Sequence, residues 1–318
     1  MYFGIFIAKK LKIVDKPNKR KIHKVEVVNL SGILIYSYLS LVTLNNEYVN
    51  LIKEIIVIGF AVIIIGFLDD RKEVNPITKL TLLFFPSCYL ILNGFKITNL
   101  GHYEHIDFIE LGKFSLIFTL LAVMLLINAI NYLDGTDGLL TGYTIIAFGY
   151  FYFLSDKQAQ YSEIFLIFSY ILFISLIFNF LPSSSSYKSF LGDSGSLFIG
   201  FFISFTIIFL YKYKNIHPAF LIWSCWLPVY DFIHVTFNRL ITKTNFLKPD
   251  RSHFHHIILK FFSNSHSKTF LLINFLNLVI IFIGYVVCLK IGKIYSLTLF
   301  IILFVFFTLI KIRLKKFI

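Results

Sequence analysis

Long apolar runs, separated by short stretches of charged or turn-forming residues, dominate this sequence. A helix needs about 20 mostly apolar residues to cross the hydrocarbon core of a bilayer. Ten runs come near that length, and they fall at 27–44, 51–68, 77–94, 113–133, 138–154, 162–181, 194–211, 216–236, 270–289 and 294–312. The runs are continuously apolar and do not alternate, which argues against a transmembrane barrel. The pattern therefore predicts an all-α, polytopic integral membrane protein with about ten transmembrane helices.

The first eight residues form a further apolar stretch, Met1–Ala8, that is too short to span a bilayer. Basic residues follow this stretch and do not precede it, which is not the order of a secretory signal peptide. We interpret it as a short N-terminal remnant of a span. Because the sequence has no internal repeat and no second type of segment, we expect residues 1–318 to form one transmembrane domain.

Composition agrees with this pattern and excludes other classes of protein. Hydrophobic residues make up 57% of the chain and charged residues 15%, whereas soluble domains are about half apolar and about a quarter charged. A soluble multi-domain enzyme, a disordered chain and a coiled coil are therefore excluded. The cysteines, Cys88, Cys225 and Cys288, lie in separate apolar runs and have neither metal-site nor disulfide spacing.

The net charge of +13 is explained by the predicted loops. If residues 9–26 are cytosolic and the sides alternate, the cytosolic segments hold 22 of the 30 Lys and Arg residues and the outer segments hold 8. An excess of Lys and Arg marks the cytoplasmic side of a membrane protein. The charge therefore requires no nucleic acid partner, and the active loops are expected in the cytosol.

Five polar clusters lie on that predicted cytosolic side. The first is the basic stretch Asp15-Lys-Pro-Asn-Lys-Arg-Lys-Ile-His23, and the second is the pair Asp69-Asp70 at the end of a span. Adjacent carboxylates raise each other's pKa unless a cation compensates them. The pair is consistent with a solvated helix end beside Arg71 and Lys72, or with carboxylates that face a metal ion or a phosphate.

The third cluster lies at the end of the run 113–133. Asn128, Asn131 and Asp134 recur every three residues, so on a helix they share one broad face. Polar side chains are costly at the end of an apolar span unless they are compensated, and nearby glycines let Asp137 approach the same place. The alternative is that the asparagines form hydrogen bonds between helices.

The fourth cluster, Gly192-Asp193-Ser-Gly-Ser196, immediately precedes an apolar run. Asp193 or Ser194 could cap the helix that follows. Asp193 could equally be a hard oxygen ligand for Mg²⁺, with the glycines allowing a phosphate to approach closely. These two interpretations are compatible.

The fifth cluster is rich in histidine, Pro249-Asp-Arg-Ser-His253-Phe-His255-His256. A short helix capped by Asp250 would place His253 and His256 on one face. With Arg251 at the positive end of that helix, the face would bind phosphate. Zinc binding and plain loop polarity remain alternatives, although the zinc motif His-Glu-x-x-His is absent.

Taken together and in this order, the five clusters resemble those of the polyprenyl-phosphate N-acetylhexosamine-1-phosphate transferase superfamily, glycosyltransferase family 4. The similarity covers the stretch from about Asp15 to His256. The histidine stretch and Asp231 resemble the branch that initiates O-antigen, common-antigen and teichoic-acid synthesis. The related phospho-MurNAc-pentapeptide translocase has three consecutive histidines instead, and it is the alternative within the superfamily.

The resemblance implies a reaction and its partners. Such enzymes transfer a sugar-1-phosphate from a UDP-N-acetylhexosamine to undecaprenyl phosphate in the bacterial inner membrane, release UMP, and use Mg²⁺ or Mn²⁺. Membrane lipid is a further partner, and the resemblance also allows a homodimer. The implied roles are catalysis for Asp69, Asp70 and Asp134, and metal binding for Asp193 and Asn131. Nucleotide and phosphate binding is implied for Asn128, Asp137, Arg251, His253, His255 and His256, and acceptor-phosphate binding for Arg20, Lys21 and His23.

Two other classes of membrane protein agree less well with the sequence than a transferase does. A transporter would carry ionisable groups near the centres of its spans, whereas these spans have essentially none there, and Asp231 with His234 lies near a cytosolic end. A membrane metalloprotease is disfavoured because the sequence lacks the zinc motif His-Glu-x-x-His. The sequence differs from the superfamily in having Val28-Asn-Leu-Ser31-Gly32 where a proline and glycine pair is usual.

Overall fold

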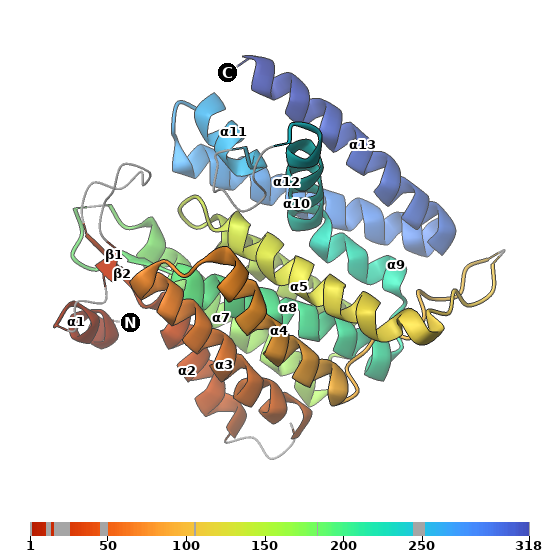
Figure 1. Cartoon of the computed structure of the whole chain (residues 1–318), viewed down its shortest axis with the longest axis horizontal. Helices are drawn as coiled ribbons and strands as arrows, with labels where there is room; N and C mark the ends of the chain where they lie inside the picture. Colours follow the sequence, from red (N-terminus) through yellow and green to blue (C-terminus); the bar gives the residue numbers. More distant parts are fainter. Residues whose placement is uncertain are drawn as a thin grey trace. The chain divides into compact units, whose positions relative to one another are not determined.

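The computed structural model of this chain describes residues 2–10, 14–15, 26–44, 50–104, 106–182, 184–243 and 252–317. Within those residues the chain is almost entirely helical, and its strands have only two or three residues each (Figure 1). The all-α prediction is confirmed. The residues group into two compact units, Met1–Leu90 with Leu140–Ile203 and Ile91–Leu139 with Ser204–Ile318. Each unit is described separately.

The first unit contains a small sheet and a set of packed helices. Its elements are α1 (Tyr2–Lys10), β1 (Val14–Asp15), β2 (Val27–Asn29), α2 (Ser31–Leu44), α3 (Asn50–Lys72), α4 (Pro76–Leu92), α6 (Leu139–Leu154), α7 (Gln160–Phe180), β3 (Ser189–Phe190) and the start of α8 (Gly192–Lys214). Strand β2 pairs antiparallel with β1 and parallel with β3, with Asn29 opposite Phe190. Helix α2 packs against α3 and α7 (Figure 1).

Aromatic side chains form the core of this unit. Phe148 of α6, Phe168 of α7 and Phe202 of α8 are almost completely buried. The Phe168 ring lies 4.6 Å from that of Phe148 and 4.8 Å from that of Phe202, both in edge-on geometry, which aromatic pairs prefer. This packing holds the first half of α8 in the interior of the unit and thereby fixes where its N-terminus lies.

The second unit is built from long helices. Its elements are η1 (Gly112–Phe114), α5 (Ser115–Leu133), the end of α8, α9 (Pro218–Leu221), η2 (Ile222–Cys225), α10 (Trp226–Ile241), α11 (Phe254–Phe261), α12 (His266–Lys290) and α13 (Lys293–Phe317). Helix α5 packs along α10, and α12 packs along α13 (Figure 1). The turn between α12 and α13 contains Gly292 with a positive φ of 143°, a conformation that favours glycine.

A carboxylate from a preceding loop caps α13. Glu104 Oε1 accepts from the Lys293 N–H at 2.6 Å, and Glu104 Oε2 accepts from the Ile294 N–H at 3.1 Å. These bonds, that from Lys293 above all, lower the pKa of Glu104. The first amides of a helix have no partner within the helix. Glu104 supplies the hydrogen-bond acceptors for the first two amides of α13.

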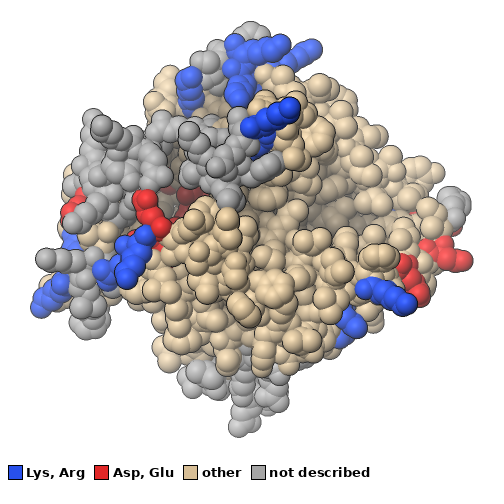
Figure 2. Space-filling model, viewed as in Figure 1, with Lys and Arg blue, Asp and Glu red and all other residues tan. Residues whose placement is uncertain are grey.

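Each of the ten predicted runs coincides with a helix or a helical segment. Six segments among the described residues are long and apolar enough to cross a membrane: Gly112–Leu133, Tyr161–Phe180, Gly192–Lys214, Pro218–Ile241, His266–Lys290 and Lys293–Lys316. Three shorter apolar helices match the runs at 27–44, 77–94 and 138–154, and α3 contains the run 51–68. Figure 2 shows a face on which broad areas carry no Lys, Arg, Asp or Glu. The chain is therefore a multi-pass membrane protein.

Candidate active site

Two groups of polar side chains stand out against the apolar helices, one in each unit. The acidic cluster, in the first unit, comprises Asn29, Asp69, Asp70, Lys79 and Asp193. The histidine cluster, in the second unit, comprises Asp231, His253, His255, His256 and Lys311.

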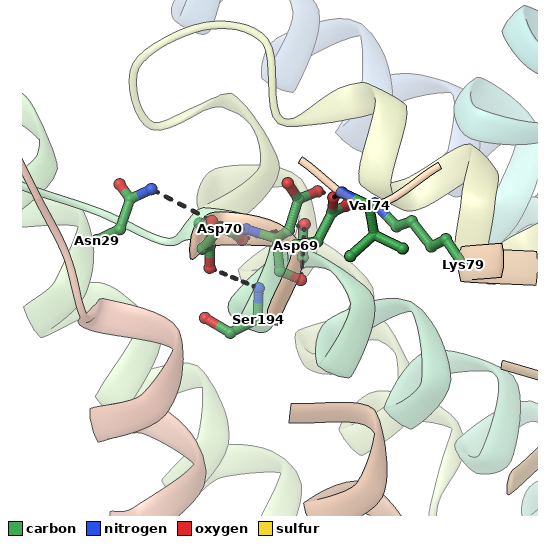
Figure 3. A network of polar contacts seen from close by, with 9 residues as sticks. Asn29, Asp69, Asp70, Val74, Lys79 and Ser194 are labelled. Carbon is green, nitrogen blue, oxygen red and sulfur yellow. Dashed lines mark hydrogen bonds and ion pairs between the residues drawn. The ribbon is translucent and has the colours of Figure 1, made fainter. Parts of the chain in front are cut away.

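Asp70, near the C-terminus of α3, caps the N-terminus of α8 (Figure 3). Its Oδ1 accepts from the Asp193 N–H at 2.9 Å, and its Oδ2 accepts from the Ser194 N–H at 3.1 Å. Asn29 Nδ2 donates to Asp70 Oδ1 at 3.2 Å. A carboxylate in this position satisfies free amides and meets the positive end of the helix dipole. Asp70 therefore fastens α3 to α8, and the catalytic role predicted for it stays a prediction.

Two glycines, one on α3 and one at the start of α8, allow these two helices to lie in close contact. Gly192 has a φ of +71°, and a Cβ added there would lie 2.7 Å from Asp70 Oδ2. A Cβ on Gly66 of α3 would lie 2.5 Å from the Ser194 nitrogen. The sequence predicted that the glycines around Asp193 admit a phosphate. In this structure Gly192 lies against the carboxylate of Asp70, because the backbone of α3 passes directly beside the start of α8, and the approach of a phosphate stays a prediction.

Lys79, in the first turn of α4, links two of the acids (Figure 3). Its Nζ lies 2.6 Å from Asp69 Oδ2 and 3.0 Å from Asp193 Oδ1. Asp69 Oδ1 accepts from the Val74 N–H at 2.7 Å, which holds Asp69 in place. From the sequence, Lys79 is expected only to be one of the cytosolic charges. The available signal was a single lysine inside the run 77–94, since a charge in such a run needs a partner.

The acids differ in exposure and in charge balance. The side chain of Asp193 is 35% exposed and that of Asp69 11%. Burial, followed by the negative charge of Asp193, raises the pKa of Asp70 to about 7, against the opposing effect of the Asp193 and Ser194 amides. Asp193 is therefore the carboxylate of the cluster best placed to meet a ligand from solvent.

The acidic cluster suits Mg²⁺ in the chemistry of its donors. Mg²⁺ is usually held by one or two carboxylates together with waters and substrate phosphates, and Asp69 and Asp193 already share one cationic group. Within the described ranges no three His, Cys, Asp or Glu side chains are close enough to hold an ion by themselves. Substrate phosphate would have to complete the coordination. The pairing of Asp193 with Asn131 as ligands stays a prediction.

In the second unit, the end of α5 and the loop after it carry the third polar cluster. Asn128 and Asn131 lie on α5 as predicted, and Asn128 Nδ2 donates to the Met124 carbonyl of the same helix at 2.7 Å. Asp134 is the C-cap residue, and its N–H donates to the Asn131 carbonyl. Asp137 N–H donates to Nδ1 of His266, the first residue of α12, at 3.2 Å. The roles predicted for Asn128, Asp134 and Asp137 stay predictions.

Asp231 of α10 organises the histidine cluster. Its Oδ2 lies 2.8 Å from His253 Nδ1, while its Oδ1 accepts from the Phe254 N–H at 2.9 Å and from Lys311 Nζ at 2.6 Å. The helix expected in this stretch exists as α11, but it begins at Phe254 with His253 as its N-cap residue. The carboxylate that caps its first amide is that of Asp231, on another helix.

The three histidines have different environments. His253 and His256 lie one turn apart, and the His256 N–H donates to the His253 carbonyl at 3.1 Å. His255 is 1% exposed and lies against Gly135, where an added Cβ would be 2.1 Å from His255 Nε2. Burial, followed by the charges of His256 and His253, holds the pKa of His255 well below its usual value. His255 therefore packs as a neutral ring beneath the loop, and His256 is the more accessible histidine.

Four predicted residues lie outside the described part of the chain. They are Arg20, Lys21, His23 and Arg251. Their phosphate-binding roles stay predictions. Among the described polar groups, Asn29, Lys79, Asp231, His266 and Lys311 also have clear partners, and no role was predicted for them from the sequence.

Comparisons with known proteins agree with the resemblance. The model of the glycosyl transferase family 4 matches residues 53–211. An undecaprenyl-phosphate alpha-N-acetylglucosaminyl 1-phosphate transferase of Yersinia pestis is 30% identical over 80% of this chain and 73% of that protein. The protein of the same name from Escherichia coli K12 is 29% identical over 82% of this chain and 72% of that protein. A probable undecaprenyl-phosphate N-acetylglucosaminyl 1-phosphate transferase of Bacillus subtilis is 28% identical over 96% of this chain and 83% of that protein.

Replacing Asp70 should loosen the start of α8. In Asp70→Asn an NH₂ donor takes the place of one oxygen that now accepts an amide, so we expect a loss of about 1–2 kcal/mol in the free energy of unfolding. Thermal unfolding in detergent micelles measures this change. Glu73→Gln, an exposed change just after α3, serves as the control. Equal stability of Asp70→Asn and the wild type would contradict the capping role.

Replacing Lys79 should make the protein more responsive to divalent cations. Lys79→Met leaves Asp69 and Asp193 without the ammonium between them, so the carboxylates repel each other and a bound cation relieves the repulsion. We expect MgCl₂ to raise the unfolding temperature more in Lys79→Met than in the wild type, with the exposed Lys72→Met as control. Equal shifts in all three proteins would place Mg²⁺ binding away from these two acids.

Proposed function

Because this chain belongs to glycosyl transferase family 4, we propose that it transfers N-acetylhexosamine-1-phosphate from a UDP-sugar to undecaprenyl phosphate and releases UMP. The observation that carries this proposal is the extent of the match, because relatives named for this reaction align over 80% or more of the chain. The acidic cluster on a multi-pass membrane protein supports it chemically. The product would initiate a cell-envelope polysaccharide on its lipid carrier.

On the metal side, we assign Asp193 as the residue that would hold Mg²⁺ or Mn²⁺, with Asn131 as a further ligand. When bound, the ion neutralises the diphosphate and polarises it. Asp193 is the most exposed acid of its cluster, and Asp70 fixes its backbone. Positioning and charge stabilisation are the main tasks of an enzyme that transfers phosphoryl groups.

On the acceptor side, we assign Asp69 together with Lys79. Both carboxylate oxygens of Asp70 accept backbone amides, which leaves Asp69 as the member of the pair suited to face the phosphate of undecaprenyl phosphate. The Lys79 ammonium would bond to that phosphate, and the Asp69 carboxylate would accept a proton from it. Asp134 is assigned to the catalytic group from the family motif alone.

On the donor side, we assign His253 and His256, with Asn128, Asp137 and Arg251, to the nucleotide and the diphosphate. His253 and His256 lie one helical turn apart at the N-terminus of α11, where the helix dipole favours an anion. His255, which is buried, would support them from beneath.

The names of the relatives favour UDP-N-acetylglucosamine as the donor. They also favour the polysaccharide-initiating branch over the phospho-MurNAc-pentapeptide translocase, in agreement with the spaced histidines. These relatives are bacterial, and we propose the cytoplasmic membrane as the location of this protein, with the polar clusters facing the cytosol. A homodimer stays a prediction.

The reaction is tested with purified protein and undecaprenyl phosphate in detergent. We expect UMP release from UDP-N-acetylglucosamine with Mg²⁺ or Mn²⁺, no release with EDTA, and no rescue by Zn²⁺, because the assigned ligands are hard oxygens. Asp193→Asn should lower turnover by about 100-fold or more and keep the unfolding temperature, since it removes one carboxylate oxygen from the metal site. A panel of UDP-sugars identifies the sugar. Full activity of Asp193→Asn at ordinary Mg²⁺ would remove Asp193 from the site.

Orientation in the membrane is tested with reporter fusions. The excess of Lys and Arg in the predicted cytosolic loops leads us to expect a cytoplasmic signal from fusions at Ile318 and within 237–269, and an external signal from one within 95–112. An external C-terminus would reverse the assignment of the histidine loop to the cytosol.

A further inference from the structure

A buried lysine lies near the end of an otherwise apolar helix. Lys311 belongs to the candidate span Lys293–Lys316 of α13, and its side chain is only 2% exposed. Its neighbours Ile310 and Ile312 are 51% and 45% exposed. The charge therefore points into the second unit while the apolar side chains beside it point outward, which is the arrangement expected of an ionisable residue in a membrane helix. Such a charge needs a partner.

The partner is Asp231 of the histidine cluster. Lys311 Nζ donates to Asp231 Oδ1 at 2.6 Å, and the Asp231 side chain is 5% exposed. Two buried charges that pair in this way compensate each other, whereas removing one of them leaves the other uncompensated. Asp231 also accepts from the Phe254 N–H. One carboxylate thus ties α13 to the first turn of α11.

The same carboxylate sets the chemistry of His253. Since Asp231 Oδ2 accepts from Nδ1 at 2.8 Å, the neutral ring carries its proton on Nδ1 and has its lone pair on Nε2. The ring of Tyr132, on α5, lies 5.1 Å from that of His253 and stacks on Phe232 of α10. The ring is therefore fixed in both tautomer and orientation.

We propose that Lys311 is a positioning residue for the histidine cluster, because it compensates Asp231 and so keeps that carboxylate bonded to His253 and to the start of α11. This inference rests on the proposed function, in which the histidine cluster contacts the UDP-sugar. Lys311 lies 100 residues beyond the segment that matches the family model, and its role follows from its contacts alone.

The test begins with three single variants of the complete protein. Lys311→Met keeps the length of the side chain and removes its charge, and Lys311→Arg keeps the charge. Lys315→Met changes an exposed lysine one turn further along α13 and is the matched control. We expect Lys311→Met to raise the KM for UDP-N-acetylglucosamine about 10-fold or more, as loss of a residue that orients a ligating histidine does, with a smaller change in kcat. Lys311→Arg should recover most of the affinity, and Lys315→Met should leave both constants unchanged.

The double variant Lys311→Met with Asp231→Asn separates positioning from stability. It removes both buried charges, so the unfolding temperature lost in Lys311→Met should largely return. The KM should stay high, because the amide no longer provides a carboxylate for His253. A KM that returns to normal together with the stability would overturn the inference and leave Lys311 as a purely structural residue.

His253→Ala distinguishes failure of this inference from failure of the proposed function. A normal KM for the UDP-sugar in His253→Ala would overturn both the donor role of the histidine cluster and the inference. A raised KM in His253→Ala beside a normal KM in Lys311→Met would overturn the inference alone.

Discussion

The structure depends on carboxylates that cap helices other than their own. Asp70 of α3 caps α8, Asp231 of α10 caps α11, and Glu104 in a loop caps α13. The first amides of any helix lack partners within it, and in an apolar environment an unsatisfied amide costs several kcal/mol. Each carboxylate meets that need and also joins segments far apart in the sequence. Two of the three capped helices carry proposed active-site residues in their first turn, so in α8 and α11 the cap also positions the chemistry.

Acids at the starts of α8 and α11 create a second requirement, a compensating positive charge, which two lysines meet. Lys79 compensates Asp69 and Asp193 in the first unit, and Lys311 compensates Asp231 in the second. Both lysines lie on apolar helices and turn their charge inward. A buried charge is tolerated only when it is paired and hydrogen-bonded, so the position of each lysine is fixed by its acid. Cap, acid and lysine therefore occur together at the starts of α8 and α11.

The sequence predicted the helices well, because hydrophobic runs of bilayer length determine where helices form in such a chain. It also identified Asp69, Asp70 and Asp193, and the structure brings these three together from two helices of the first unit. It did not distinguish Asp70, which caps α8, from Asp69, because the difference depends on which helix lies next to α3. Lys79 and Lys311 were counted as loop charges, since a charge at the edge of an apolar run can face water or the interior. The start of α11 was placed too early because its cap comes from Asp231, 23 residues away from the amide it binds.

The two attachments of α13 have a consequence for biosynthesis. Helix α13 follows in the sequence every element to which it is attached, and chains are made from the N-terminus. Glu104 and Asp231 are therefore synthesised before the amides and the lysine that bind them. Until α13 enters the membrane, α10 carries an uncompensated acid in an apolar segment, which is costly. Insertion of the hairpin of α12 and α13 supplies Lys311 to Asp231, so a nascent chain arrested before residue 293 would keep that buried acid without its lysine.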